Sequence, residues 1–205
     1  MSDLAPTAGA TADFSGTFTI ADAAVSIRDL PPGAFLVHST NCLGIWGAGF
    51  AAQMSYTFPA ACERYRQFCY AAREEASDRW PPASLVGKCL VIPPQEADVV
   101  GMGAPAVSVV CLFTSYGYGR PNKAIGKPGL DRQSKILDQT VVALGDFRRQ
   151  LEEARGRGEV RDVVIYSPQI NSGAFRVPWD RTKGAVQNAF YGFEGVWNFM
   201  PVVSS

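Results

Sequence analysis

At 205 residues the chain has room for one α/β domain with a substantial core, but not for two comfortable domains and a linker. Its hydrophobic share of 47% and charged share of 19% are those of an ordinary globular protein. Acidic and basic side chains number 19 each, so net charge does not indicate nucleic acid or an anionic membrane as a partner. We therefore expect neither.

The cysteines and the N-terminal segment bear on the cellular compartment. The five cysteines form no CxxC pair, and most lie in apolar runs where a thiol packs as a small hydrophobic group, which predicts a reducing compartment. The opening MSDLAPTAGATADFSG lacks the basic start and apolar core of a secretory signal, and no run approaches the roughly 18 apolar residues of a membrane span. We expect a cytoplasmic protein, with a nuclear location also open, that is monomeric. Residues 1–13 are expected to be disordered, and residues 14–205 to form a single domain.

Short apolar runs alternate with longer helical patterns along the chain, which is typical of a three-layer α/β fold. Residues 17–21 are expected to form an edge strand, and the continuous apolar run 33–39 a central strand buried on both faces. A polar turn with closely spaced glycines follows, and then helix formers over 48–56. Pro59 suits the first position of a second helix. Apolar positions in this helix recur at intervals of three and four: Cys62, Tyr65, Cys69 and Ala72.

The middle of the chain predicts a hairpin, a loop and a long helix. Residues 88–93 and 106–115 are β-branched runs bounded by Gly or Pro, so they are expected to be strands joined as a hairpin with an exposed loop. Residues 115–129 have the composition of a loop. The longest helical pattern follows, with Asp131 as a cap and Ser134 three residues on. Its expected buried stripe is Leu137, Val141, Leu144 and Leu151.

The last part of the chain repeats the order of strand, glycine turn and helix. A strand is predicted over 160–170, a polar glycine turn over 171–179, a short helix from about Asp180 with this residue as its cap, and a last strand over 195–200. Both glycine turns therefore follow a buried strand and precede a helix. In open α/β sheets, ligands bind at this position.

Small residues in both turns let backbone amides approach a ligand, and the helix that follows adds unpaired N–H groups and a positive dipole end. The first turn has Gly44, Gly47, Ala48 and Gly49, and the second has Ser172, Gly173 and Ala174. Two such cradles suit a diphosphate; alternatively, the glycines serve only to allow positive φ. The spacing matches neither GxGxxG nor GxxxxGK[ST], so neither a dinucleotide fingerprint nor a P-loop is indicated.

Several segments taken together resemble one family in order and spacing, over about residues 16–200. The chain resembles the macrodomains, with the greatest likeness to the small ADP-ribose-1″-phosphate phosphatases. The segments are HSTNCLGIWGAGFAAQM (38–54), FPAACERYRQFC (58–69), GKCLVIP (87–93), VVCLFTSYGYG (109–119) and SPQINSGAFRVPW (167–179). The resemblance implies a three-layer αβα fold with a mixed, mostly parallel sheet and ADP-ribose lying across the strand ends. It implies neither a cofactor nor a metal.

The resemblance also implies roles for single residues. Asn41 would hold the distal ribose in the catalytic site, with the alternative that it only caps a turn. The loop from Gly44 to Gly49 would wrap this ribose and the diphosphate. The second loop would give amides to the diphosphate, with Phe175 against the ribose. His38, the only histidine, is the expected proton carrier for ester hydrolysis; the alternative is a histidine hydrogen-bonded at a strand end.

Other residues of the two loops have two interpretations each. Trp46, like Phe175, is expected to stack on or shield the sugar, with a place in the core as the alternative. Arg176 either contacts a terminal phosphate or points to solvent. Tyr116 and Tyr118 lie in a third loop near the same strand ends, where they either line the pocket or belong to the surface.

The sequence differs from the family pattern at two places. Many macrodomains carry an acidic residue after a glycine near the first strand, where it recognises the adenine amino group; here Asp22 lies in this region without the glycine. The Lys and Asp pair of one group of ADP-ribosyl-glutamate hydrolases is missing, since Phe175 takes one of its positions. The predicted function is hydrolysis of ADP-ribose-1″-phosphate to ADP-ribose and phosphate. Removal of ADP-ribose from a modified protein, and binding of ADP-ribose without catalysis, are the alternatives.

Overall fold

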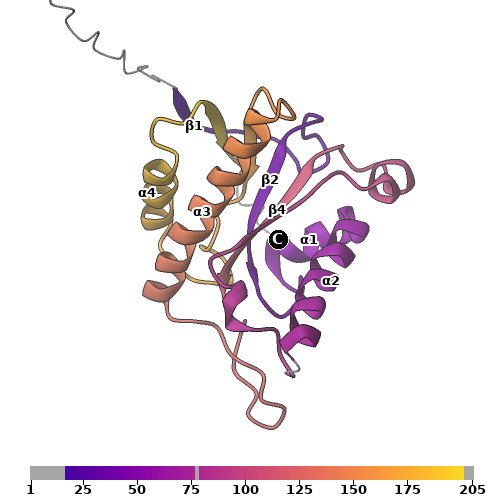
Figure 1. Cartoon of the computed structure of the whole chain (residues 1–205), viewed down its shortest axis with the longest axis vertical. Helices are drawn as coiled ribbons and strands as arrows, with labels where there is room; N and C mark the ends of the chain where they lie inside the picture. The colour runs from indigo at the N-terminus through magenta and orange to yellow at the C-terminus, as the bar shows by residue number, and fades with distance from the viewer. Residues whose placement is uncertain (1–16, 77–78, 201–205) are drawn as a thin grey trace, which may run out of the picture.

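Six strands form one sheet, and two pairs of helices cover its faces (Figure 1). The computed structural model describes residues 17–76 and 79–200, so the predicted tail at 1–13 lies outside the described residues. The strands are β1 (Phe18–Asp22), β2 (Phe35–Asn41), β3 (Cys89–Ile92), β4 (Ser108–Ser115), β5 (Val164–Ser167) and β6 (Gly195–Phe199). The helices are α1 (Gly49–Thr57), α2 (Pro59–Ala76), α3 (Gln133–Gly156) and α4 (Trp179–Ala189), with short turns of helix at η1 (Ala83–Leu85) and η2 (Ala97–Gly101).

The sheet is mixed and mostly parallel, as predicted. Its order is β1-β6-β5-β2-β4-β3, and only the pairing of β3 with β4 is antiparallel. β1 lies at one edge and β2 near the centre, which confirms the two first strand predictions. β5 begins later than expected because residues 161–162 bend before it.

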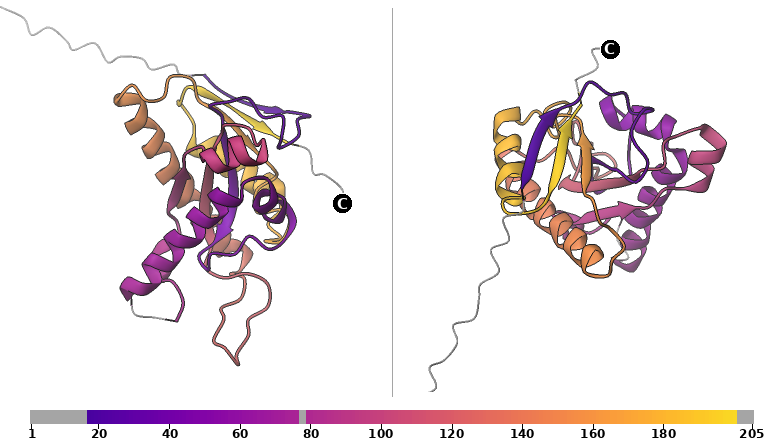
Figure 2. Two further views of the ribbon diagram at one scale, coloured as in Figure 1. Left: turned by 90° about the vertical axis from the view of Figure 1, so that its right-hand side faces the viewer. Right: turned by 90° about the horizontal axis from the view of Figure 1, so that it is seen from above.

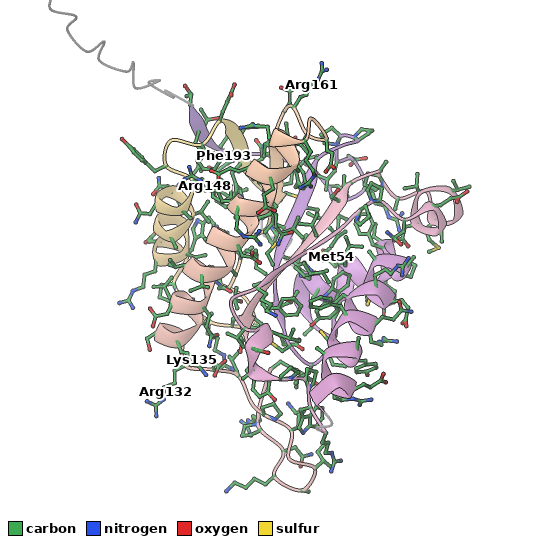
Figure 3. The ribbon with its side chains drawn as sticks, in the orientation of Figure 1. Met54, Arg132, Lys135, Arg148, Arg161 and Phe193 are labelled. Atoms are coloured by element: carbon green, nitrogen blue, oxygen red, sulfur yellow. The ribbon has the colours of Figure 1, made fainter. Side chains whose placement is uncertain are left out.

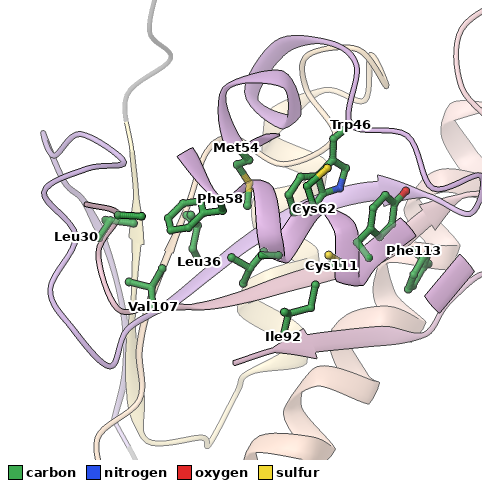
Figure 4. Packing of buried hydrophobic residues seen from close by; sticks show 14 of the residues in the cluster. Leu30, Leu36, Trp46, Met54, Phe58, Cys62, Ile92, Val107, Cys111 and Phe113 are labelled. Atoms are coloured by element: carbon green, nitrogen blue, oxygen red, sulfur yellow. The ribbon is translucent and has the colours of Figure 1, made fainter. Parts of the chain in front are cut away.

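Each face of the sheet has its own apolar core. The α1–α2 core packs under these two helices and includes Leu36, Cys111 and Phe113 from the sheet (Figure 4). The opposite core joins α3 and α4 to Val37 and Trp197. Figures 1 and 2 show the two helix pairs on opposite sides of the strands. The alternation of side chains along β2 explains how one strand serves both cores.

Two details of the predicted elements are wrong. Val141 on α3 is 50% exposed, because the face turned to the sheet is shifted by about one residue. The buried positions of this helix are Ile136, Gln139, Thr140, Ala143, Leu144, Phe147 and Leu151. The connection between β3 and β4 is also more than an exposed loop, since it contains η2 and buries Asp98. The Asp98 carboxylate accepts hydrogen bonds from the backbone N–H groups of Ala60 (2.7 Å) and Ala61 (3.0 Å), and so caps α2.

Candidate functional site

Both glycine turns leave the same edge of the sheet from neighbouring strands. β2 and β5 pair in parallel, so their carboxyl ends lie side by side, and the turns follow at residues 42–48 and 168–178. The first turn leads to α1 on one face of the sheet, and the second leads to α4 on the other face. Loops that part to opposite faces leave a crevice between them, which is the usual ligand position in such sheets. We call these turns the first corner and the second corner.

Asn41 shapes the first corner through its side chain. Its Oδ1 accepts a hydrogen bond from the Leu43 N–H (2.9 Å), and its Nδ2 donates to the Ile45 carbonyl (2.7 Å). The Tyr65 hydroxyl donates to the Asn41 carbonyl (2.5 Å). Gly44 follows with a φ of +74°, a conformation that favours glycine. Asn41 therefore holds the loop in shape, which is the turn-forming role open to this residue type; its predicted contact with a ribose stays a prediction.

The far half of the first corner presents its backbone to solvent. Gly47, Ala48 and Gly49 are exposed, and a Cβ placed on Gly49 would meet nothing within 4 Å. No side chain caps the start of α1 at Ala48. The first N–H groups of this helix thus have no side-chain cap, and the start of a helix is a place where an anion can accept such hydrogen bonds.

The structure places Trp46 in the core rather than over the crevice. Its side chain is 6% exposed, and its ring stacks on Tyr65 with centroids 5.2 Å apart. Figure 4 shows it among the apolar side chains of the α1–α2 core, with Met54 and Phe113. The expectation of a ring that shields the sugar is therefore corrected, because tight aromatic packing holds this indole beneath the loop.

His38 is also buried, which argues against its predicted role as proton carrier. It is 2% exposed, its ring lies edge-on to Trp46 at 4.7 Å, and its Nε2 lies 3.7 Å from the Cys111 thiol. Burial lowers its pKa from 6.5 to about 3, so the imidazole is neutral at pH 7 and the imidazolium that would act as a general acid is not populated. The alternative interpretation, a packed histidine near a strand end, fits the structure.

A hydrogen-bond hub at Asn171 holds the second corner, and sequence reasoning missed it. The Thr114 hydroxyl donates to Asn171 Oδ1 (2.8 Å), and Asn171 Nδ2 donates to the Thr140 hydroxyl (2.8 Å). The Asn171 N–H donates to Ser39 Oγ (3.2 Å), and its carbonyl accepts from the Val177 N–H (3.0 Å). One buried residue thus ties β2, β4 and α3 to both ends of the loop.

Two irregularities make this hub possible. Asn171 has a φ of +64°, which asparagine tolerates better than most residues. In β4, Phe113 pairs with Thr40 and Ser115 pairs with Asn41, so Thr114 is an extra residue in the register. Such a bulge re-aims a side chain, here toward Asn171. The asparagine inside a glycine turn was the only signal for this role in the sequence.

The second corner offers exposed backbone at Gly173 and Ala174. Ser172 Oγ is buried and has no hydrogen-bond partner among the described residues. Arg176 is exposed at a φ of +60°, with its carbonyl bonded to Gln133 Nε2 (2.6 Å). Exposed backbone at Gly173 and Ala174 is compatible with a cradle for an anion, and the predicted contact with a diphosphate stays a prediction.

Phe175 is 8% exposed and packs with Ile136 and Val177, so the ring serves the core rather than lying free for the ribose. This corrects the stacking role expected for it.

Asp180 does not cap α4, whose N-cap is Pro178. It lies in the first turn of this helix, where its negative charge interacts favourably with the helix dipole.

A pocket of about 310 Å³ opens at the ends of β1 and β6, beside Asp22. Its lining residues are Asp22, Ala23, Ala24, Gln169, Phe199 and Met200. Gln169 belongs to the second corner, so this pocket lies beside that corner, at the same edge of the sheet. The pocket is apolar on most of its lining and carries one carboxylate, which suits a base with an amino group.

The third loop follows β4 and lies beside the first corner. The Cys42 N–H donates to the Tyr116 carbonyl (3.0 Å), and the Tyr116 hydroxyl donates to the Pro81 carbonyl (2.8 Å). Asp131 does not cap α3 as predicted, because its Oδ2 accepts from the Tyr116 N–H (2.7 Å). Burial alone would raise the pKa of Asp131, but hydrogen bonds from Lys135 and Tyr116 outweigh it and lower the pKa. Tyr118 is half-buried against Lys127.

The part of the chain that the structure describes contains neither a candidate metal site nor a helix suited to span a membrane. Residues 17–76 and 79–200 hold no group of three His, Cys, Asp or Glu side chains arranged for a metal ion. Within the same ranges, no helix has the length and apolar character needed to cross a membrane.

Comparison with known proteins gives both sequence relatives and fold neighbours, although no family model matches the chain. It is 33% identical over 177 residues to an ADP-ribose 1″-phosphate phosphatase of Neosartorya fischeri, covering 78% of this chain and 84% of the relative. It is 31% identical over 156 residues to a protein of the same name from Debaryomyces hansenii, covering 73% and 79%.

Solved structures show the same fold at low sequence identity. The macrodomain of Mycobacterium tuberculosis DarG is 18% identical, with a TM-score of 0.60, and the match covers 91% of this chain and 99% of that one. The macrodomain of Thermus aquaticus DarG is 20% identical, with a TM-score of 0.59 and the same coverage. The chain therefore belongs to the macrodomain family, among the relatives of the ADP-ribose 1″-phosphate phosphatases.

Proposed function

We propose that this protein hydrolyses ADP-ribose-1″-phosphate to ADP-ribose and inorganic phosphate. The observation that carries the proposal is the position of the two corners, on neighbouring parallel strands whose loops part to opposite faces. Relatives at 33% and 31% identity bear the name of this activity.

The substrate would lie along that edge with its base near Asp22. The pocket at the ends of β1 and β6 receives the adenine, and the exposed amides at Gly173 and Ala174 bind the diphosphate. The distal ribose then reaches the first corner, beside Asn41 and the open start of α1. In the reaction a water attacks the phosphorus, and the bond from phosphorus to the ribose oxygen breaks.

The catalytic contribution of this chain is proposed to come from backbone amides rather than from His38. Amides fixed before the reaction stabilise the charge on the transferring phosphoryl group, and they need no reorganisation. The exposed amides of Gly47, Ala48 and Gly49 stand at the start of α1, whose dipole adds to this effect. The buried imidazole supports the first corner from below.

One incubation tests the reaction directly. Purified protein is given ADP-ribose-1″-phosphate, and free phosphate is followed with and without a chelator. We expect phosphate release that the chelator does not reduce. Loss of activity with chelator would show that a metal takes part, and no release from the ester would remove the proposed function.

A variant of Gly173 tests whether the second corner binds the ligand. A Cβ on Gly173 would meet nothing within 4 Å, so Gly173→Val adds a side chain to open space without a clash inside the protein. We expect binding of ADP-ribose, measured by calorimetry, to weaken about tenfold or more, since a change of 1.4 kcal/mol is tenfold. Gly145→Val, at a position on α3 that is equally open, is the matched control and should bind as the unchanged protein does.

Binding of ADP-ribose without catalysis is the second candidate function. The burial of the single histidine favours it, because the crevice then lacks an imidazole for proton transfer. Tight calorimetric binding of ADP-ribose combined with no phosphate release would establish this alternative. The cytoplasmic location and the monomeric state stay predictions from the sequence; the five free, buried cysteines accord with a reducing compartment.

A further inference from the structure

The connection from β4 to α3 has an unbalanced charge. Residues 117–130, which we call the basic arm, contain Arg120, Lys123 and Lys127 and no acidic side chain. The whole chain has equal numbers of acidic and basic residues, so this concentration is local. Among the described residues, no carboxylate pairs with any of these three cations.

The basic arm is a closed hairpin rather than a loose loop. Asn122 and Lys127 face each other in an isolated bridge, and the Leu130 N–H donates to the Gly119 carbonyl (3.0 Å). Lys127 Nζ lies 4.0 Å from the centre of the Tyr118 ring and donates to the Tyr118 carbonyl (2.7 Å). Figure 1 shows the hairpin projecting at the bottom of the molecule, from the carboxyl end of β4. The backbone of the arm is therefore held in shape, the Lys127 side chain is fixed against Tyr118, and Arg120 and Lys123 are exposed on the hairpin.

The base of the arm touches both corners. Leu130 packs against the cluster of Phe175 and Val177 from the second corner. The Tyr116 carbonyl, directly before the arm, accepts the Cys42 N–H at the start of the first corner. The second corner, the first corner and the arm follow β5, β2 and β4, which are consecutive neighbours in the sheet. The arm therefore lies beside the first corner, on the side away from the second.

This order places the arm beyond the distal ribose. From β1 to β2 there are three strand spacings, or about 14 Å at about 4.8 Å each. If the adenine lies near Asp22 at β1 and the distal ribose near Asn41 at β2, a group on the far side of that ribose points toward β4. A phosphate monoester there adds a charge of roughly −1.5 to −2, which ADP-ribose lacks.

We propose that the basic arm is the specificity element that recognises the terminal phosphate of the substrate and so separates ADP-ribose-1″-phosphate from its product, ADP-ribose. This inference rests on the proposed function for the direction in which the ligand lies. The cations at Arg120, Lys123 and Lys127 attract the terminal phosphate, while the corners bind the part that substrate and product share.

The test compares two ligands on a neutralised arm. The variant Arg120→Gln/Lys123→Gln/Lys127→Gln is assayed for kcat/KM with the phosphate ester and for the Kd of ADP-ribose by calorimetry. We expect kcat/KM to fall about tenfold or more and to lose most of its dependence on salt, while the Kd for ADP-ribose changes less than about threefold. Equal losses for both ligands, or no loss for the ester, would overturn the proposal.

Matched controls separate charge from folding. Arg28→Gln/Arg64→Gln/Arg161→Gln removes three cations at the other end of the strands, as Figure 3 shows for Arg161, and should leave both measurements unchanged. Because Lys127 also ties the hairpin, the double variant Arg120→Gln/Lys123→Gln keeps that contact and should still lower kcat/KM for the ester by about threefold or more.

Failure of the proposed function gives a different result from failure of the arm. If the unchanged protein releases no phosphate, the two Kd values for the ester and for ADP-ribose are compared by calorimetry. A preference for the ester that disappears in the neutralised arm would keep the arm as the specificity element of a binding protein. If the unchanged protein and the neutralised variant each bind the ester and ADP-ribose equally well, the basic arm is not a specificity element.

Discussion

The two corners face the same crevice but are supported in different ways. Beneath the first corner lies an aromatic stack in which Trp46 packs on Tyr65 and against His38. Beneath the second lies a hydrogen-bond hub centred on Asn171. Packing depends on shape and volume, whereas a buried hub depends on donors and acceptors. The first corner should therefore tolerate a smaller aromatic residue, and the second should not tolerate the loss of a single polar group.

Removal of the Trp46 ring should have the largest effect on stability. Trp46→Ala leaves a cavity in the α1–α2 core, and we expect the free energy of unfolding in urea to fall by about 3–5 kcal/mol. Trp46→Phe keeps a ring for the stack and removes an indole N–H that has no hydrogen-bond partner within residues 17–76 and 79–200, so it should cost less than half as much. If Trp46→Ala unfolds at the same urea concentration as the unchanged protein, the core placement of this ring is wrong.

Loss of the Asn171 amide should be the next largest effect. Asn171→Ala removes the partner of the buried Thr114 hydroxyl and puts a strained φ on alanine, for a cost of about 2–4 kcal/mol. Asn171→Gly accepts the backbone conformation and isolates the side-chain part of this cost. In both variants KM for the ester should rise more than kcat falls, because the amides of the second corner are displaced. Unchanged KM in Asn171→Gly would show that the loop does not need the hub.

Acid should destabilise the fold through His38. Its pKa of about 3 in the folded protein lies below the usual 6.5, so as the pH falls the unfolded chain takes up the proton first. Stability is full above about pH 6.5 and declines toward pH 3, at about 1.4 kcal/mol per pH unit, which gives about 2 kcal/mol by pH 5.

Urea denaturation at pH 7.5 and pH 5.0 measures this loss. His38→Leu, which cannot titrate, should remove most of the difference between the two pH values. The same variant also tests the role of His38 beneath the first corner. If His38 carried a proton in the reaction, its ionisation would appear in the pH profile of kcat and would disappear in His38→Leu. An unchanged stability difference in His38→Leu would contradict the low pKa.

The Arg176 substitution should have the smallest effect. Arg176→Gly relieves a positive φ but loses chain stiffness, so the free energy of unfolding should change by no more than about 1 kcal/mol. Within the described part of the chain the exposed guanidinium makes no hydrogen bond or ion pair. The backbone of Arg176 is bonded instead, its carbonyl to Gln133 Nε2 and its N–H to the Gly173 carbonyl. A large loss of ester binding with stability unchanged would instead assign this side chain to the phosphate.

The pattern of elements could be read from the sequence because it depends on local rules. Continuous apolar runs predicted β2 and β4, and Pro59 predicted the start of α2, where the structure begins it. The two corners were found in the same way, from small residues between a strand and a helix. Boundaries were less accurate, as the late start of β5 and the exposed Val141 show.

The roles of side chains inside the corners could not be read in this way. Trp46 and Phe175 lie in polar loops by sequence, and His38 lies near the end of a predicted strand, yet all three side chains are buried against segments that are distant in the chain. Asn171 gains its role only because a bulge in β4 re-aims Thr114, and no local pattern marks that bulge. Asp131 and Asp98 likewise bind backbone groups far along the chain.

The sequence by itself determined the class of fold, the order of the elements and the two glycine corners, because periodicity and backbone freedom are properties of neighbouring residues. Only the tertiary structure decided that β2 and β5 are neighbours, which rings support the corners from below, and that the basic arm stands beyond them. These features depend on contacts between residues far apart in the chain. Such contacts bury His38 and lower its pKa, which takes the charged imidazolium out of the chemistry at pH 7.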